Sequence, residues 1–219
     1  MVKDSLEVIA QLKSINFNQQ NIWLVTSDAI NMYPNISNDE GIMACNNYFD
    51  LYAHACKCFS PKELLVKLLN IIMNKNVFKF GNTWWVQKDG TTMGTPSACN
   101  YATIVFAYSE RTNILPTFKN NFLLYIRFID DIFIVWKDSP TTPNVFDSFK
   151  KSLNDQCKLK WKTVDKSTKL DFLDITIKLD QLNGTFVTCT FQKESNIHLH
   201  IPGNSAHPPG VVKSIIFGR

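Results

Sequence analysis

The chain has 219 residues, of which 45% are hydrophobic, and its formal net charge is +4 at pH 7. This length and apolar content suffice for one compact unit with a buried core and exclude a disordered or low-complexity protein. The sequence contains no N-terminal apolar signal stretch and no apolar run long enough to span a bilayer, so we expect an intracellular protein of the nucleus or cytoplasm, without a membrane partner.

The first strongly patterned element is an apolar strand over residues 22–28 that ends in an acid. Ile-Trp-Leu-Val-Thr-Ser precedes Asp28, and runs rich in β-branched and aromatic residues favour strands, whereas Asp disfavours them. Tyr33 follows five positions later and is itself followed by Pro34. The pattern predicts a carboxylate at the end of a buried strand, with an aromatic side chain shortly beyond it.

Two helices and a hairpin are expected next. Asn38 begins a segment with a plausible cap and an acidic first turn, and Ser60 is an N-cap followed directly by proline. Residues 77–80 and 83–87 are two short strand-like runs separated by Gly-Asn. That arrangement predicts a short hairpin.

A small, turn-forming segment at residues 90–98 precedes an apolar helical run. Gly94 and Pro96 mark a loop-to-helix junction, because proline is favoured in the first turn of a helix and glycine lets another backbone or a base approach closely. Such a segment is more often an ordinary helix start than a substrate pocket. Its position between two acidic strands is what makes it informative.

The most informative stretch runs from Tyr125 to Trp136, where Asp130 and Asp131 separate two apolar runs. The pattern predicts a hairpin whose turn holds two adjacent carboxylates, although a solvated turn is the plain interpretation of such a pair. If the strand ending at Asp28 lies in the same sheet, three carboxylates gather. Oxygen ligands without neighbouring Cys or His suit a hard ion such as Mg²⁺, and the geometry is that of a two-metal site.

Further elements follow the acidic hairpin. Apolar residues at helical spacing predict a helix over 143–154 that covers one face of the sheet. Residues 159–164 alternate like a half-buried strand and lead into a turn. Two strands, 169–178 and 185–191, are joined through an Asn-Gly pair, which is a strong hairpin signal.

The order of these segments resembles motifs A, B and C of a reverse transcriptase palm. Their amino-acid sequences resemble those of the Penelope-like retroelements and related algal or protist elements. The segments that carry the resemblance are Leu24–Asp28 with Tyr33–Ile36, Thr92–Pro96, Tyr125–Asp131, Phe172–Ile175, and His198–His200 with Ser205–Pro209. The similarity runs from about residue 20 to the end of the chain. As a set these motifs are specific.

The resemblance implies an α+β fold, in which the antiparallel sheet of a polymerase palm is backed by helices and accompanied by part of the fingers and the start of a thumb. The whole chain, 1–219, would be one reverse transcriptase domain. Residues 20–180 would form the palm with part of the fingers, and 181–219 the primer-grip hairpin and the beginning of the thumb. Because few residues precede the first acid, we expect a palm-centred piece of a longer protein that extends primers poorly by itself.

The resemblance also implies a metal site. Asp28 and Asp130 would be the principal ligands of two Mg²⁺ ions, or of Mn²⁺ in their place, with Asp131 as a supporting carboxylate. The backbone carbonyl of Ala29 would complete the shell of one ion. Tyr33 would be the steric gate that stacks below the sugar and clashes with a 2′-hydroxyl.

Other residues are assigned to the substrate by the same resemblance. Met93 and Gly94 would line the templating and incoming base pair, and Phe128, just before the acids, is included among the substrate contacts. A basic residue after the palm helix protonates the departing pyrophosphate in this family, and general acid help of that kind is worth about a hundredfold or more. Lys166 is the candidate because of its expected turn position, although an ordinary solvated face is the competing interpretation for any single lysine of this lysine-rich region.

The implied activity is RNA-directed DNA polymerisation by a retroelement enzyme. A primer 3′-hydroxyl attacks the α-phosphorus of a deoxynucleoside triphosphate while an RNA or DNA template directs the base. Two alternatives remain open from the sequence: an RNA-directed RNA polymerase, which the aromatic Tyr33 argues against, and a non-catalytic nucleic-acid-binding relic of a retroelement.

Overall fold

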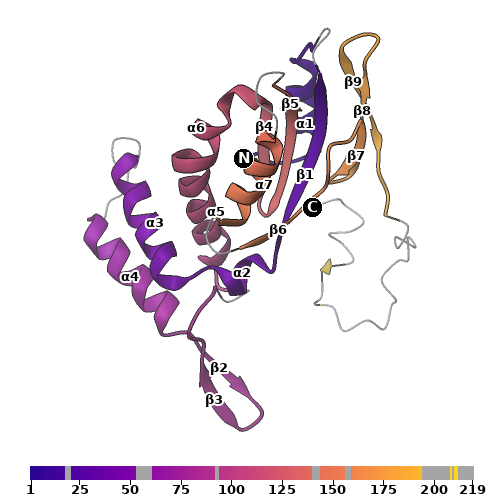
Figure 1. The fold of residues 1–219 in the computed structure, drawn as a ribbon. Coiled ribbons are helices and arrows are strands. Elements are labelled where there is room, and N and C mark those ends of the chain that lie inside the picture. The colour runs from indigo at the N-terminus through magenta and orange to yellow at the C-terminus, as the bar shows by residue number, and fades with distance from the viewer. Residues whose placement is uncertain are drawn as a thin grey trace.

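The computed structural model describes residues 1–17, 21–52, 61–91, 94–139, 144–155 and 159–193, together with residues 208, 210 and 211. Antiparallel sheets backed by helices form the α+β fold that was expected (Figure 1). Within these residues, no helix combines the length and the apolar character needed to cross a membrane.

The centre of the fold is a four-stranded antiparallel sheet with the strand order β4-β5-β1-β6. Its strands are β1 (Ile22–Ile30), β4 (Phe122–Phe128), β5 (Asp131–Lys137) and β6 (Lys160–Thr163). The predicted apolar strand is therefore present, although it continues past Asp28 to Ile30, and the predicted hairpin with two carboxylates is also present. Strand β1 is apolar on both faces over its first half because a layer of structure covers each face of the sheet.

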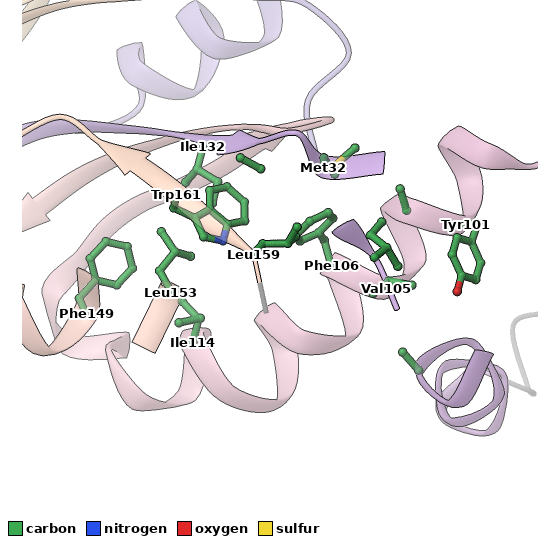
Figure 2. Packing of buried hydrophobic residues seen from close by; sticks show 14 of the residues in the cluster. Met32, Tyr101, Val105, Phe106, Ile114, Ile132, Phe149, Leu153, Leu159 and Trp161 are labelled. Carbon is green, nitrogen blue, oxygen red and sulfur yellow. The ribbon is translucent and has the colours of Figure 1, made fainter. Parts of the chain in front are cut away.

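Helices cover one face of this sheet in successive layers (Figure 1). The helices are α5 (Ala98–Ser109) and α7 (Val145–Asp155) next to the sheet, α3 (Asn38–Leu51) on α5, and α4 (Lys62–Asn74) on α3. In the larger hydrophobic core, the rings of Phe106 and Trp161 meet edge to face with centroids 5.5 Å apart (Figure 2). Phe149 from α7 packs on Trp136, with 5.3 Å between their centroids.

A helix and a second sheet cover the opposite face. They are α1 (Ser5–Lys13) and the three-stranded antiparallel sheet of β7 (Lys169–Phe172), β8 (Ile175–Asp180) and β9 (Thr185–Thr190). Their apolar side chains meet Leu24 of β1 and Phe133 of β5 in a second core. Helix α1 had not been predicted from the sequence, although it carries an N-cap: the Asp4 carboxylate accepts a hydrogen bond of 2.9 Å from the Glu7 amide.

The strand expected over residues 169–178 is divided in the structure. A turn at Leu173 and Asp174 separates β7 from β8, and Leu173 has the left-handed φ of +54°. The apolar side chains that face the core change phase at this point, from even positions such as Phe172 to odd positions such as Ile175. Because successive residues of a strand point to opposite faces, such a change of phase requires an interruption. Strands β8 and β9 form one hairpin, so the expected boundary at residues 180 and 181 falls in its turn.

Short elements complete the structure. They are the helices α2 (Met32–Asn35) and α6 (Leu115–Thr117), a π-helix (Glu110–Ile114), a 3₁₀ turn (Lys119–Asn121), and the predicted hairpin of β2 (Val77–Phe80) and β3 (Thr83–Val86). The hairpin extends away from the helical layer (Figure 1). Its base is held by Asn38, whose side-chain amide donates to the carbonyls of Met73 at 3.1 Å and Lys88 at 3.2 Å.

Candidate active site

The strand register places four side chains in a row across one end of the central sheet. Phe128 lies directly opposite Asp131, Asp131 opposite Asp28, and Asp28 opposite Lys162. Directly opposed residues of neighbouring strands project from the same face, with Cβ atoms about 5 Å apart. The two acidic segments therefore meet as predicted, and Lys162 is a neighbour of the acids that sequence reasoning did not identify.

The third acid, Asp130, occupies the turn between β4 and β5 next to Ile129. The Ala29 amide donates to the carbonyl of Asp130 at 3.3 Å, so the backbone of β1 is tied to this turn. The charge of Asp130 contributes to raising the pKa of Asp28, Asp131 and Tyr33. Asp130 is thus the acid that lies within electrostatic reach of all the others and of the tyrosine.

The acids repel one another at neutral pH. Burial, with smaller contributions from the charges of Asp130 and Asp28, raises the pKa of Asp131 to about 6, and the charge of Lys193 opposes this rise. Partial desolvation is also the main reason that the pKa of Asp28 is raised; Asp130 adds to the shift, and Lys162 opposes it. Lys162 and Lys193 therefore neutralise only part of the negative charge of the three acids, and a bound cation would relieve the remaining repulsion.

The raised pKa of Asp131 predicts that the ionised carboxylate lowers the free energy of unfolding of the metal-free protein as the pH rises. An acid that binds its proton more tightly in the folded state stabilises the fold below its ordinary pKa, and this stability is lost as the pH rises through about 6. Asp131→Asn should raise the free energy of unfolding at pH 7 by on the order of 1 kcal/mol, a value discounted because solvent screens a half-exposed carboxylate. Urea unfolding in EDTA from pH 4.5 to 7.5 measures it.

The control for this experiment is Asp147→Asn, on the exposed surface of α7. The difference in stability between Asp131→Asn and wild type should shrink toward pH 4.5, whereas Asp147→Asn should show no such trend. A loss of stability in Asp131→Asn at pH 7 would contradict the proposed repulsion.

Tyr33 lies in α2, immediately after β1, and packs against the larger core. Partial burial raises the pKa of its hydroxyl, and a hydrogen bond with the Cys99 thiol and the charges of Cys99 and Asp130 raise it further. The carbonyl of Tyr33 accepts a hydrogen bond of 2.7 Å from the Thr91 amide. Tyr33 is thus held between the acidic turn and the segment that precedes α5.

Gly90 makes this contact between segments possible. It has a φ of +82°, and a Cβ atom there would lie 2.5 Å from the carbonyl oxygen of Pro34 and 2.7 Å from its Cα atom. Only glycine allows the backbone to pass so close to the turn after β1. Sequence reasoning singled out Gly94, but the tight approach occurs at Gly90.

The predicted substrate residues are placed differently from one another. Phe128 lies in the row with the acids, partly buried against the smaller core. Gly94 is exposed, with a φ of +98° and open space where a Cβ would be, so it leaves room for a ligand. Met93 lies outside the described residues.

The structure does not bring Lys166 to the acids. Residues 165–168 were expected to turn, but the chain continues alongside β1 there: the Leu24 amide donates to the Ser167 carbonyl at 2.8 Å. Lys166 pairs with Asp138, which also accepts from the indoles of Trp23 at 2.8 Å and Trp136 at 3.0 Å. Asp138 follows the last residue of β5, on the order of 20 Å from the acidic end of that strand.

A buried ion pair behind the sheet was also missed. Arg127 is 3% exposed, and its Nε donates to Glu110 at 2.7 Å. The same carboxylate oxygen accepts a hydrogen bond of 2.8 Å from the Tyr125 hydroxyl. Burial and the Glu110 charge raise the pKa of Tyr125 well above its ordinary value, which keeps this hydroxyl protonated as a donor. The sequence signal for this ion pair was Arg127 itself, a charged residue in an apolar strand three positions before the adjacent acids.

The donor set at the front of the sheet fits hard divalent ions. Its ligands are oxygens only, from three carboxylates and the neighbouring backbone, and these are the ligands that Mg²⁺ and Mn²⁺ accept. In the part of the chain that the structure describes, no three acidic, His or Cys side chains already form a closed metal-binding cluster.

Solved structures of similar fold include telomerases. The chain superposes on telomerase from Candida albicans in complex with the TWJ fragment of telomeric RNA with a TM-score of 0.62 and 15% identity, over 83% of this chain and 34% of that one. For telomerase from Candida tropicalis with the same fragment the TM-score is 0.58 and the identity 13%, over 98% and 35%. The apo Candida tropicalis enzyme truncated from its C-terminal domain gives 0.57 and 12%, over 86% and 40%.

No protein-family model matches the chain, and no curated protein matches it in sequence. The chain spans about a third to two fifths of the length of these telomerase chains. At 12–15% identity the likeness concerns the fold alone. It confirms an α+β fold of the reverse transcriptase, polymerase-like kind.

Proposed function

We propose that this chain is the palm-centred part of an RNA-directed DNA polymerase of a retroelement, similar to the Penelope-like reverse transcriptases. The observation that carries the proposal is the convergence of Asp28, Asp130 and Asp131 at one end of the sheet, with Tyr33 beside them. Three acids and an aromatic from separate segments make a solvated turn an insufficient explanation. The substrates are a primer, an RNA or DNA template and deoxynucleoside triphosphates.

The roles follow from position. Asp28 and Asp130, with Asp131 in support and the Ala29 carbonyl beside them, would hold the divalent ions. When bound, two such ions would activate the primer 3′-hydroxyl and neutralise the leaving pyrophosphate. The protein's own contribution is alignment: the β1–β5 register and the turn hold the carboxylates on rigid strands, so little reorganisation is needed at the moment of reaction.

The proton donor to pyrophosphate is reassigned in this proposal. Lys166 is engaged by Asp138 at the far end of β5, whereas Lys162 faces Asp28 across the strand pair. The Lys162 side chain is exposed and can move to contact the phosphates of a bound triphosphate. Its charge already acts on Asp28, since it opposes the rise in the pKa of that carboxyl.

Primer extension tests the proposal. The purified chain is mixed in excess with a labelled primer on RNA or DNA templates, and deoxy- or ribonucleotides are offered with Mg²⁺ or Mn²⁺. Extension with deoxynucleotides on the RNA template is the expected result. Preference for ribonucleotides would instead identify an RNA-directed RNA polymerase, and binding without any extension would identify a non-catalytic relic.

A further prediction concerns the choice of sugar. Tyr33→Ala should raise ribonucleotide incorporation relative to deoxynucleotide by about tenfold or more, because removing a steric clash is worth roughly 1–3 kcal/mol. Competition between the two nucleotides in the extension assay measures the ratio. Tyr33→Phe keeps the ring and loses only the bond to Cys99, so it should retain the wild-type ratio. An unchanged ratio in Tyr33→Ala would make Tyr33 a core aromatic.

A further inference from the structure

All three guanidinium nitrogens of Arg127 donate hydrogen bonds to buried or partly buried partners behind the acidic turn. Nε donates to Glu110 at 2.7 Å, Nη1 to the Ile129 carbonyl at 2.8 Å, and Nη2 to the Thr103 carbonyl in α5 at 3.3 Å. The guanidinium also lies over the Phe106 ring, 5.5 Å from its centroid. These contacts connect β4 with helix α5, the π-helix that follows it and the turn that carries the acids.

We infer that Arg127, oriented by Glu110, is a positioning residue that fixes the turn of Asp130 and Asp131 against helix α5. Arg127 pairs with Ile132, whose side chain belongs to the core on the helical side, whereas Asp131 lies in the row on the other face. The guanidinium therefore cannot touch the substrate from this position. It acts on the acids through the backbone of the turn.

The turn needs such support because its geometry is costly. Ile129 has a φ of +51°, and a β-branched residue in the left-handed region persists only where its surroundings hold it there. The carbonyl that Arg127 binds belongs to the peptide unit joining Ile129 to Asp130. Fixing that carbonyl fixes the plane of the peptide, which contains the N and Cα atoms of Asp130, and so restricts where the Asp130 side chain leaves the backbone.

Glu110 provides the matching charge. Its side chain is 10% exposed, and its oxygen accepts from both Arg127 and Tyr125. It is the first residue of the π-helix Glu110–Ile114, and π-bulges within helices recur at functional sites. A buried ion pair is weak evidence for stability in itself, since well-packed apolar residues often replace such a pair without loss. The hydrogen bond from Arg127 to the Ile129 carbonyl of the strained turn gives the Arg127–Glu110 pair a role in addition to packing.

The test compares Arg127→Lys with wild type in hydrogen exchange. Lysine keeps the charge opposite Glu110 but cannot offer three directed donors. The amides of residues 129–132 should exchange at least about tenfold faster in the variant, while the centre of β5 stays protected. Glu110→Gln keeps an oxygen that can accept from Arg127 and should shift the same amides by less. Leu153→Ala, in the core of α7 and apart from this network, is the control for general destabilisation and should show no change confined to the turn.

A second readout rests on the proposed function. In primer extension, Arg127→Lys should lower the rate by about 10- to 100-fold and raise the Mg²⁺ concentration for half-maximal rate, with the deoxynucleotide KM within about twofold of wild type. Leu153→Ala should leave the Mg²⁺ dependence unchanged at temperatures where it is folded. If wild type extends no primer, the proposed function fails, and the exchange data still decide the role of Arg127. Unchanged exchange at the turn in both Arg127→Lys and Glu110→Gln would overturn the inference.

Discussion

Asp130→Asn should lower primer extension by on the order of a thousandfold or more while leaving the fold intact. The substitution keeps the volume of the side chain and removes the charge that lies within reach of Asp28, Asp131 and Tyr33. Bound divalent ions contribute several kcal/mol to transition-state charge stabilisation, and their position depends on this carboxylate. Single-turnover extension at saturating nucleotide measures the loss, and circular dichroism with urea unfolding checks the fold.

The matched control for this result is Asp147→Asn. The chemical change is the same, but the Asp147 side chain is largely exposed on α7, where it pairs with Lys150. Exposed ion pairs contribute about 0–1 kcal/mol, so this variant should extend primers like wild type. Normal extension by Asp130→Asn would remove the basis for assigning polymerase chemistry to the three acids.

Gly90→Ala should be strongly destabilising and should also displace Tyr33, the proposed steric gate for the sugar. The new Cβ would lie 2.5–2.8 Å from backbone atoms of Pro34, in a residue whose φ is +82°. Overpacking of this kind typically costs about 1–3 kcal/mol, and a positive φ in a residue with a side chain adds about 1–2 kcal/mol. Relief of the clash must separate the segment of Gly90 and Thr91 from that of Tyr33, which breaks the 2.7 Å bond between Thr91 and Tyr33.

Gly81→Ala is the control that separates the steric clash with Pro34 from the backbone strain of a positive φ. Gly81, in the β2–β3 turn, has a φ of +60°, and a Cβ atom there would meet nothing within 4 Å, so this variant carries the conformational cost alone. Urea unfolding should show Gly90→Ala to be less stable than Gly81→Ala by about 1–3 kcal/mol. Under conditions where both are folded, only Gly90→Ala should lose discrimination between ribo- and deoxynucleotides. Equal losses of stability would mean that the turn after β1 moves aside freely.

The acidic hairpin and the strand before it were predictable because their signals are local. An apolar run interrupted by Asp130 and Asp131, and another ending in Asp28, specify strand ends through residue preferences that need no knowledge of distant partners. The hairpin of β8 and β9 was found for the same reason, through its Asn-Gly turn. The division between β7 and β8 also has a local signal, because the apolar residues change from even to odd positions there. The prediction of a single strand over 169–178 did not include this change.

The surroundings of the acids depended on long-range register. No local pattern distinguishes Lys162 from Lys166, since both lie in a lysine-rich stretch after α7. Only the pairing of β6 with β1 puts Lys162 opposite Asp28, and only the continuation of the chain alongside β1 beyond β6 puts Lys166 beside Asp138. A shift of the register by one residue would turn each of these side chains to the other face.

The sequence by itself determined that three carboxylates accompany apolar strands and that Tyr33 follows the first of them. Residue type and alternation carry this information because they act over a few neighbouring positions. The tertiary structure alone decided which lysine faces the acids, that Gly90 lies against Pro34, and that Glu110 and Arg127 meet behind the turn. Those contacts join residues from separate elements, and their existence depends on how helices and strands pack, which no short stretch of sequence encodes.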